Sequence, residues 1–538
     1  MRVQVGISSA LALLLACQGT FSDDPYAAGE PLDPVQDPDL APASCSPELE
    51  PAVRGVPTRI LTGRELNNAL RELFPNVELP NQEIQFDGRV ESCVVYSRDD
   101  VLEAHIREYR GIAETLAPLL VEDLNAVMDC AGASDADCAT RYIEDFASRA
   151  FRRPVSADEQ AGLVALYRTG AEVSHAEGMR YVFEAVLQTP SFIYVHETPA
   201  DTLAPHEVAQ RMAAMFARSV PDSELLAAAE DGSLMNANAR VEHAERLLAT
   251  PAGQAAIGAF VGEWFGIDRL RDTPLALEDQ ALAAGMEEET RRFVDRLVSQ
   301  GSARFTDLLA ANYTYLNEAM AAHYGYSLDG AEAIGDGWYR VELEGSAGLL
   351  THGSFLSQHH GPVHRGLAIR RGLLCGDVPG PDDIDITAVP TGETEAERSK
   401  TEKRLDHPTC GGCHRMMDPM GLALDTFDDH GVPRTEDQHG NPVRDDGEIL
   451  SSDVDGVIQG AAELGNRLSQ SEDVRACVAR NLFAWSYARA ATAADSCVIE
   501  RIQNHLATND DDFRAALVGI VASDQFVRSL QPRVGGEQ

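Results

Sequence analysis

Apolar residues that recur at helical spacing behind helix-start signals are the feature that most limits how this chain can fold. In "TGRELNNALRELF" the leucines share one helical face, and Thr62 with Glu65 predicts a capping box. "VSADEQAGLVALYR" repeats the arrangement with Ser156 and Glu159. Similar segments follow along most of the chain, whereas alternating strand patterns are scarce and "GWYRVEL" is the clearest of them. The sequence therefore predicts a mostly α, multi-domain protein.

The pattern changes along the chain and suggests where domains begin and end. Helical segments break at Pro221-Asp222, and from about residue 336 to 450 the chain is rich in Gly, Pro and His with weak periodicity. Loop-rich stretches of this kind often carry function, and amphipathic helices return after residue 460. We expect an N-terminal helical domain at 53–125, a helical domain with Cys130 and Cys138 at 126–198, a central helical domain at 199–335, a loop-rich domain at 336–450 and a C-terminal helical domain at 451–538.

The N-terminus predicts export. After Arg2 the apolar run "GISSALALLLAC" has the length of a secretory signal core and is too short to span a membrane. It ends in Cys17 within a stretch that resembles a bacterial lipobox, and Gln18 stands where an Asp would favour inner-membrane retention. We expect a signal peptide at 1–16, lipidation of Cys17, and an acidic Pro-rich linker at 17–52 that tethers the folded body to the outer membrane of the cell envelope. The alternative is an ordinary signal peptide with a coincidental Cys.

The net charge limits which classes of partner molecule the protein can bind. The chain has 86 acidic and 44 basic side chains, a formal net charge of −42. A surface this negative repels phosphate backbones, which argues against nucleic-acid binding. It could instead steer a basic redox partner protein, and the membrane is expected as a partner only through the lipid anchor.

Cysteine usage is typical of an oxidising compartment. Of the ten cysteines, Cys17 is assigned to lipid and two belong to a C-x-x-C-H motif, which leaves seven that should mostly pair outside the cytoplasm. The stretch "CAGASDADC" is a short loop of turn formers, and it predicts a Cys130–Cys138 disulfide.

The other pairings are less constrained by spacing. A Cys477–Cys497 disulfide would join two helices around an Ala-rich turn. Cys45–Cys93 is the remaining expectation, and it leaves Cys375 unpaired. Connectivity does not follow from sequence alone, so only the Cys130–Cys138 and Cys477–Cys497 pairs are predicted.

The C-x-x-C-H motif lies in "HPTCGGCHRMMDPMG" and comprises Cys410, Cys413 and His414. With ten Cys and fifteen His among 538 residues, roughly 0.005 such matches are expected by chance. Two thiols at this spacing add to the vinyl groups of a haem, and the adjacent His then ligates the iron from one face. We therefore predict one covalent haem c, with Cys410 and Cys413 as the thioether residues and His414 as the proximal iron ligand.

Two other interpretations of the motif stay open. C-x-x-C supplies two of the four ligands of a structural zinc site, and Cys375 with a loop His could complete such a site, although no second C-x-x-C is present. The two cysteines could also form a disulfide with each other. Export favours haem, because c-type attachment takes place outside the cytoplasm.

A distal iron ligand is harder to derive. The two methionines directly after the motif are too close to His414 to reach the opposite face of a haem, and Met420 is only slightly better placed. His359 and His360 in "SQHHGPVHRG" are the other candidates, although the simpler interpretation of each is a solvated loop histidine. The sixth position could also be open.

Basic residues follow these histidines. Arg365, with Arg370 and Arg371 behind it, could pair with the haem propionates. The simpler alternative is that these arginines balance acids nearby in a chain with a large acid excess.

Several blocks of the chain resemble a known family. Between roughly residues 55 and 530 these blocks are "ILTGRELNNALRELF", "FASRAFRRPVSADEQ", "RSVPDSELLAAAEDGSL", "DLLAANYTYLNEAMAAHYG", "GLLTHGSFLSQHHGPVHRG", "HPTCGGCHRMMDPMGLALDTFDDHG" and "CVARNLFAWSYARA". In this order they resemble bacterial exported proteins composed of the domains of unknown function 1587, 1595, 1592, 1588 and 1585. The resemblance implies a mainly helical exported protein with a cytochrome-c-like haem motif in the fourth domain, and it implies no particular reaction. The chain departs from the family at His360-Gly361, where Thr-Ser is usual, and after Cys375, where a Pro-rich run is reduced to "GDVPGPDDID".

These observations lead to three hypotheses for function. The first is an exported lipoprotein with one haem c that transfers electrons at the cell envelope. The second is a haem enzyme of the peroxidase or oxidoreductase type, with an open iron position and a substrate held by the helical domains. The third is a non-redox surface-binding or scaffold lipoprotein in which the cysteines are structural. No G-x-S-x-G, H-E-x-x-H or Walker motif points to a hydrolase or a nucleotide site.

Overall fold

The helix-start signals of the sequence become the starts of helices in the structure. α1 (Gly63–Leu73) follows Thr62, whose hydroxyl accepts from the N–H of Glu65 while the Glu65 carboxylate accepts from the N–H of Thr62. Ser156 and Glu159 form the same reciprocal cap at the start of α5 (Ala157–Ala171). Both predicted capping boxes are confirmed, and so is the strand predicted in "GWYRVEL", which is β7 (Trp338–Glu342).

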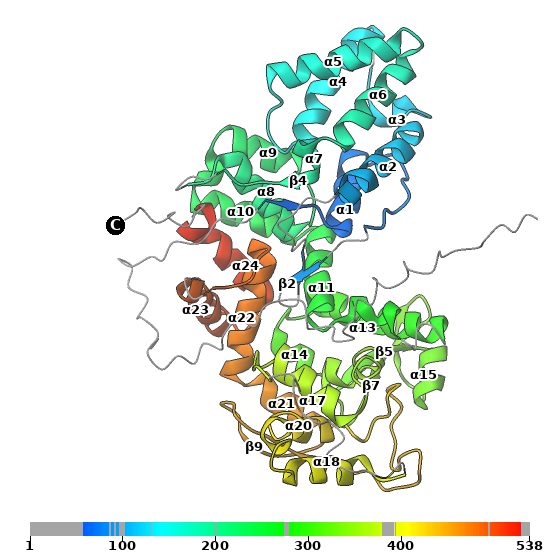
Figure 1. Cartoon of the computed structure of the whole chain (residues 1–538), viewed down its shortest axis with the longest axis vertical. Coiled ribbons are helices and arrows are strands. Elements are labelled where there is room, and N and C mark those ends of the chain that lie inside the picture. Colours follow the sequence, from blue (N-terminus) through cyan, green and yellow to red (C-terminus); the bar gives the residue numbers. More distant parts are fainter. Residues whose placement is uncertain are drawn as a thin grey trace, which may run out of the picture. The chain divides into compact units, whose positions relative to one another are not determined.

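The computed structural model describes residues 58–84, 88–90, 93–95, 103–130, 132–198, 202–273, 279–378, 392, 394–492 and 495–528. Many of its helices and strands are labelled in Figure 1, and together the elements confirm the predicted mostly α fold. The expected signal peptide, Cys17 and the linker at 17–52 lie outside these residues. Across the described ranges, no helix combines the length and the apolar character that a membrane crossing requires.

The first described segment runs to residue 198. Its helices after α1 are α2 (Glu103–Leu120), α3 (Leu124–Val127), α4 (Asp135–Ala150), α5, α6 (His175–Leu187) and α7 (Pro190–Ile193). α6 packs against both α2 and α5. Two short antiparallel pairings accompany them: β1 (Arg59–Ile60) with β4 (Tyr194–Val195), which joins the start and the end of the segment, and β2 (Gly88–Val90) with β3 (Cys93–Val95).

The central segment is also helical. It contains α8 (Pro205–Phe216), α9 (Ser223–Glu230), η1 (Ser233–Met235), α10 (Ala237–Leu248), α11 (Pro251–Trp264), η2 (Ile267–Asp272), α13 (Gln280–Gln300), α14 (Phe305–Ala310) and α15 (Glu318–Tyr324). The predicted break at Pro221-Asp222 is confirmed, because α8 ends before it and Asp222 caps α9. A three-stranded antiparallel sheet of order β5-β7-β6 follows, with β5 at Tyr313–Asn317 and β6 at Glu332–Gly335.

The segment predicted to be loop-rich, residues 336–450, is more helical than expected. It contains η3 (Gly348–Thr351), α16 (Gly353–Leu356), α17 (Gly361–Gly372), α18 (Glu397–Asp406), α19 (Gly411–His414), α20 (Asp418–Leu422) and β8 (Asp446–Ile449). α17 escapes pattern analysis because its buried positions include Arg365 and Arg370, so the buried side of the helix is not apolar in sequence.

The last segment returns to amphipathic helices as predicted. It contains β9 (Gly456–Gln459), which pairs with β8, and then α21 (Gly460–Ser469), α22 (Glu472–Tyr487), α23 (Ser496–Thr508), α24 (Phe513–Ala522) and η5 (Asp524–Val527). α22 packs against α23, and α24 packs against α10 of the central segment.

Buried apolar residues form two cores. The first is built from residues between Ile60 and Val220. The second contains residues from the central segment, from α20 and from the last helices, including Trp264, Met420 and Trp485. The three C-terminal segments therefore share one core, and the helix that follows the C-x-x-C-H motif is anchored in it.

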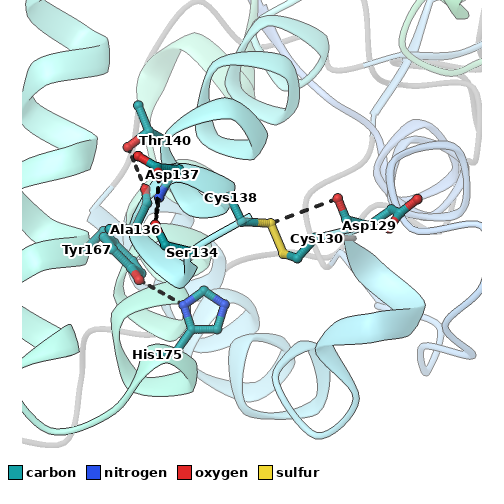
Figure 2. The surroundings of a disulfide bond; sticks show 9 residues. All are labelled: Asp129, Cys130, Ser134, Ala136, Asp137, Cys138, Thr140, Tyr167 and His175. Carbon is teal, nitrogen blue, oxygen red and sulfur yellow. Dashed lines mark hydrogen bonds between the residues drawn. A yellow bond between two sulfur atoms is a disulfide. The ribbon is translucent and has the colours of Figure 1, made fainter. Parts of the chain in front are cut away.

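The Cys130–Cys138 disulfide is present, as the sequence predicts. Figure 2 shows Cys138 in the first turn of α4, bonded to the cysteine that precedes the capping residue Ser134. The Ser134 hydroxyl accepts from the N–H of Asp137, so the disulfide and the cap fix the same helix start.

The predicted Cys477–Cys497 disulfide is wrong. Cys477, on α22, is bonded to Cys375, which was expected to be unpaired and which follows α17. Cys497 is itself disulfide-bonded, and the Cys45–Cys93 expectation lies outside the described side chains. The bonded cysteines are 102 residues apart in sequence, and only the packing of α17 near α22 brings them together.

Candidate cofactor site

The C-x-x-C-H motif forms a single helical turn, α19, between α18 and α20. The turn is closed by backbone bonds from Gly411 N to His407 O and from His414 N to Cys410 O, at 2.9 and 3.1 Å. A side chain at Gly411 would place its Cβ 2.4 Å from the carbonyl oxygen of Leu405, so α19 can approach α18 this closely only with glycine there. Cys410 and Cys413 both carry free thiols and are partly exposed.

His414 is held by a buried carboxylate. Its Nδ1 lies 2.9 Å from Oδ1 and 3.0 Å from Oδ2 of Asp418, whose side chain has no exposed area, while the His414 side chain is 22% exposed. Arg404, from α18, donates to the same carboxylate at 3.2 Å and also to the hydroxyl of Thr401. A carboxylate that accepts from Nδ1–H fixes the ring orientation and the tautomer, which leaves Nε2 as the ligand atom.

Two glycines bring α17 and α20 into backbone contact beside this turn. A Cβ on Gly366 would lie 1.9 Å from the carbonyl oxygen of Met417, and a Cβ on Gly421 would lie 1.8 Å from that of Pro362. Each helix therefore presents a glycine to the backbone of the other. The contact fixes the motif and α20 against the helix that follows the predicted distal histidines.

The predicted propionate role of Arg365 is corrected by the structure. Arg365 has no exposed side-chain area, and it donates to the carbonyl oxygens of His359, Leu424, Phe427 and Asp428 and to the Asp429 carboxylate. These bonds occupy all of its N–H groups, so none is left for a propionate. Arg370 likewise donates to three backbone oxygens, of Met416, Leu450 and Ser451. Both arginines hold loop carbonyls in place.

The three predicted distal ligands occupy different surroundings. His359 is buried, and the centroid of its ring lies 4.7 Å from the centroid of the Phe355 ring. Burial, together with the charge of Arg269, lowers the pKa of His359 to about 3, so its imidazole is neutral. His360 is the N-cap residue of α17, and its Nε2 donates to Ser357 O at 2.8 Å. Met420 is 1% exposed and belongs to the second core. Of the three, His359 is the buried neutral imidazole without a capping role.

The alternatives to haem lose part of their support. Cys410 and Cys413 are not bonded to each other, which removes the disulfide interpretation. Cys375 is held in its bond to Cys477 and so is not a thiolate for zinc. Within the residues that the structure describes, no three His, Cys, Asp or Glu side chains gather as a metal site would need.

The residues present fit a covalently attached haem. Two free thiols and a histidine lie on one turn, and Nδ1 of that histidine is engaged by a buried carboxylate. A Cβ on Gly412 would meet no atom within 4 Å, so the turn is open at this residue. When bound, such a group supplies a one-electron Fe(III)/Fe(II) couple and a site for small ligands.

Sequence reasoning missed Asp418. It lies four residues after His414, and at that spacing two side chains on a helical path meet, so "HRMMD" contained the signal. The segment was interpreted instead for its methionines.

Sequence models of four protein families match the chain. They are proteins of unknown function DUF1595 at residues 138–197, DUF1592 at 203–326, DUF1588 at 346–437 and DUF1585 at 456–526, and the short name of the DUF1588 model is PSCyt3. The C-x-x-C-H turn falls within the DUF1588 range. Comparison with curated proteins and with solved structures found no match. The chain therefore belongs to the family of proteins assembled from these domains of unknown function, in the order DUF1595, DUF1592, DUF1588 and DUF1585.

Proposed function

We propose that the protein carries one covalent haem c, attached through Cys410 and Cys413 with His414 as an iron ligand, and transfers electrons at the cell envelope. Two free thiols and a histidine on one helical turn support this function, because they are the donor set of c-type attachment. The short name of the DUF1588 model also hints at a cytochrome-like domain.

The observation that carries the proposal is the bond from His414 to Asp418. The nitrogen Nδ1 is 2.9 Å from a carboxylate that is completely buried and is further fixed by Arg404. Imidazoles that ligate metals almost always donate their other N–H to such a partner.

The test is covalent haem itself. The protein is produced with cytochrome-c maturation machinery and examined on a denaturing gel stained for haem, beside a Cys410→Ala/Cys413→Ala variant. We expect haem that survives denaturation in the parent and is absent from the variant. A folded parent without covalent haem would contradict both redox hypotheses and leave the surface-binding or scaffold role.

A haem enzyme with an open iron position is the second candidate, and the same Asp418 contact favours it. A carboxylate on the proximal histidine raises the basicity of that ligand, which supports chemistry at the opposite face. The chain offers His359 as the buried neutral imidazole that could fill that face instead. Rapid cyanide or carbon monoxide binding by the loaded parent would favour the enzyme, whereas binding that appears only in His359→Ala would favour electron transfer.

We also propose that Cys17 anchors the protein in the outer membrane. The apolar run that ends at this residue, and the acidic Pro-rich stretch after it, support the proposal. Incorporation of a labelled fatty acid that is lost in Cys17→Ala is the expected result. Export and maturation without label would mean an ordinary signal peptide.

A further inference from the structure

A second cluster of polar side chains is buried away from the C-x-x-C-H turn. It comprises Glu289 and Thr290 on α13, Thr314 on β5, Tyr324 on α15, and His352 and Ser354 around the start of α16. Each of these side chains belongs to a residue that is 5% exposed or less. The first four lie in the DUF1592 range and the last two in the DUF1588 range, so the cluster spans the junction of two family domains.

Hydrogen bonds connect these side chains into one chain. Tyr324 Oη donates to Glu289 Oε2 at 2.8 Å, and Thr314 Oγ1 donates to Glu289 Oε1 at 2.7 Å. The Thr314 hydroxyl is also 3.2 Å from Nε2 of His352. On the other side of that ring, Nδ1 lies 3.0 Å from Thr290 Oγ1, which lies 2.7 Å from Ser354 Oγ.

This chain of bonds can run in either direction. When Glu289 is ionised, Thr314 donates to it, the Nε2–H of His352 donates to Thr314, and Thr290 donates to Nδ1. When a proton has entered at Oε1, Glu289 donates to Thr314, Thr314 donates to Nε2, and a His352 ring that carries its proton on Nδ1 donates to Thr290. Hydroxyls and a neutral imidazole allow both arrangements without a change of rotamer. The cluster can therefore satisfy either protonation state of Glu289, and it does more than hold the fold together.

A small cavity beside the carboxyl group has room for a water molecule. The cavity has a volume of about 20 Å³ and is lined by Glu289, Tyr324, Ser346 and His352 together with Phe427 and Gly431. Roughly 10–15 Å³ is enough for one water molecule when polar partners are present. The cavity wall thus includes residues of both the DUF1592 and the DUF1588 ranges.

Burial favours the neutral form of Glu289. Burial raises the pKa of Glu289 to about 7, against the bonds from Thr314 and Tyr324, and burial lowers the pKa of His352 to about 3. The titratable groups that face the carboxyl are Tyr324 and Tyr326 from α15 and the turn after it, Glu344 from the segment after β7, and His352. Among the described residues, no lysine or arginine forms an ion pair with Glu289.

We propose that Glu289 is an internal acid–base site that takes up and releases one proton through a water molecule in this cavity. The chain through Thr314, His352 and Thr290, called the relay below, reverses its hydrogen bonds when the proton is taken up. Uptake converts a carboxylate and a hydronium ion into a carboxyl group and a water molecule. Because the site spans the DUF1592–DUF1588 junction, its acidity depends on how these two domains pack. The proposal is independent of whether haem is attached.

The first test is an infrared titration of the full-length protein. We expect the C=O band of a protonated carboxyl group that disappears with one-proton behaviour as the pH rises through about 7, and that is absent from Glu289→Gln. Thr314→Val removes a donor to the carboxylate and should raise the midpoint by about one pH unit. Thr351→Val is the matched control, because Thr351 lines the same cavity but bonds to Ser346 and Gly348, and its midpoint should not move.

The outcomes distinguish the alternatives. A folded parent without a carboxyl band that titrates between pH 5 and 9, or a band that persists in Glu289→Gln, overturns the site. If Glu289→Gln does not fold, the shift in Thr314→Val relative to Thr351→Val decides the question. The relay is tested by nitrogen-15 NMR of histidine-labelled protein with His352→Gln for assignment. A switch of the His352 tautomer across the titration supports the relay, and an unchanged tautomer overturns it.

Discussion

At the scale of single residues, the buried acids of this protein are distinguished by their partners. Glu65 accepts from Arg59 and from the N–H of a helix cap, and Asp418 faces His414 and Arg404. Glu289 accepts from the neutral hydroxyls of Thr314 and Tyr324. A cation nearby favours the ionised form of a carboxyl group, whereas burial alone favours the protonated form. The chemical behaviour of a buried carboxyl group therefore depends on the groups around it.

Replacing Asp418 should change the redox behaviour of the proposed haem site. Asp418→Asn keeps an oxygen acceptor for Nδ1–H of His414 but removes the negative charge. His414 then donates less electron density to the iron, so Fe(III) loses more stabilisation than Fe(II). We expect the reduction potential to rise, by about 59 mV for each tenfold loss of preference for Fe(III).

A spectroelectrochemical titration of the haem-loaded protein measures this change. Asp437→Asn is the control, because Asp437 also accepts hydrogen bonds through its carboxylate but does so from the N–H groups of its own turn. Equal potentials in the two variants would mean that Asp418 does not tune the iron ligand.

Glu65 should make stability depend on pH in the acid range. Burial opposes its ionisation, but the bidentate pair with Arg59 prevails and lowers the pKa to about 2, against 4.5 for the unperturbed group. A depressed pKa gives stabilisation that is complete above pH 4.5 and is lost as the pH falls toward 2. Glu65→Gln leaves Arg59 buried without its charge partner, so we expect a loss of about 3–5 kcal/mol at pH 7 that shrinks at pH 3.

Urea unfolding at the two pH values tests this expectation. Glu114→Gln is the control, because the Arg110–Glu114 pair lies on the surface of α2, where solvent screening leaves it little effect on stability. A deficit for Glu65→Gln that is the same at pH 3 and pH 7 would contradict the assignment of this titration to Glu65.

At the scale of elements, close backbone approach decides how the motif is held. α17 and α20 touch through Gly366 and Gly421, and arginines from α17 then hold the carbonyl oxygens of the chain around and after α20.

The stretch that follows α20 contains two successive turns of the same build, "DDHGV" and "DQHGN". In each turn an Asp accepts from two later N–H groups and a Gly adopts positive φ. The repeat was present in the sequence and was not used to predict ordered turns.

Alanine at either contact glycine should weaken the α17–α20 packing. A methyl group on Gly366 or Gly421 would overlap backbone atoms, which cannot rotate away as a side chain can. We expect Gly366→Ala and Gly421→Ala each to lower the free energy of unfolding by about 1–3 kcal/mol. Gly372→Ala, at the end of α17 where a Cβ meets nothing within 4 Å, should be neutral or slightly stabilising. Thermal unfolding followed by circular dichroism measures all three, and equal effects at Gly366 and Gly372 would contradict the contact.

At the scale of the whole molecule, a disulfide links segments that belong to different matched domains. Cys375 lies in the DUF1588 range and Cys477 in the DUF1585 range, and the two families' segments also share the second core. The bond therefore closes a long loop around the proposed cofactor site.

Loss of this long-range disulfide should cost more than loss of the local one. The Cys375–Cys477 bond closes a loop of 102 residues and the Cys130–Cys138 bond one of only 8. Loop-closure entropy predicts losses of about 4–5 and about 2–3 kcal/mol respectively. Denaturant unfolding of Cys375→Ser/Cys477→Ser and of Cys130→Ser/Cys138→Ser gives the two values. The reverse order of losses would show that strain or residual structure outweighs loop length.

The sequence by itself determined the features that depend on residues close to one another along the chain. Caps at Thr62 and Ser156, the break at Pro221, the short-loop disulfide at Cys130 and the C-x-x-C-H turn all follow from residues within a few positions of one another. Local sterics and hydrogen bonds fix these features, so a pattern is enough to predict them.

Only the tertiary structure decided which distant residues meet. The sequence favoured Cys497 as the partner of Cys477, and it left a haem propionate or nearby acids as partners of Arg365. In the structure, helix packing places Cys375 against Cys477 and backbone carbonyl oxygens around Arg365. The Glu289 cluster has no sequence signature at all, because its members come from helices and a strand up to 65 residues apart. Such contacts depend on how whole elements pack, and no spacing along the chain encodes them directly.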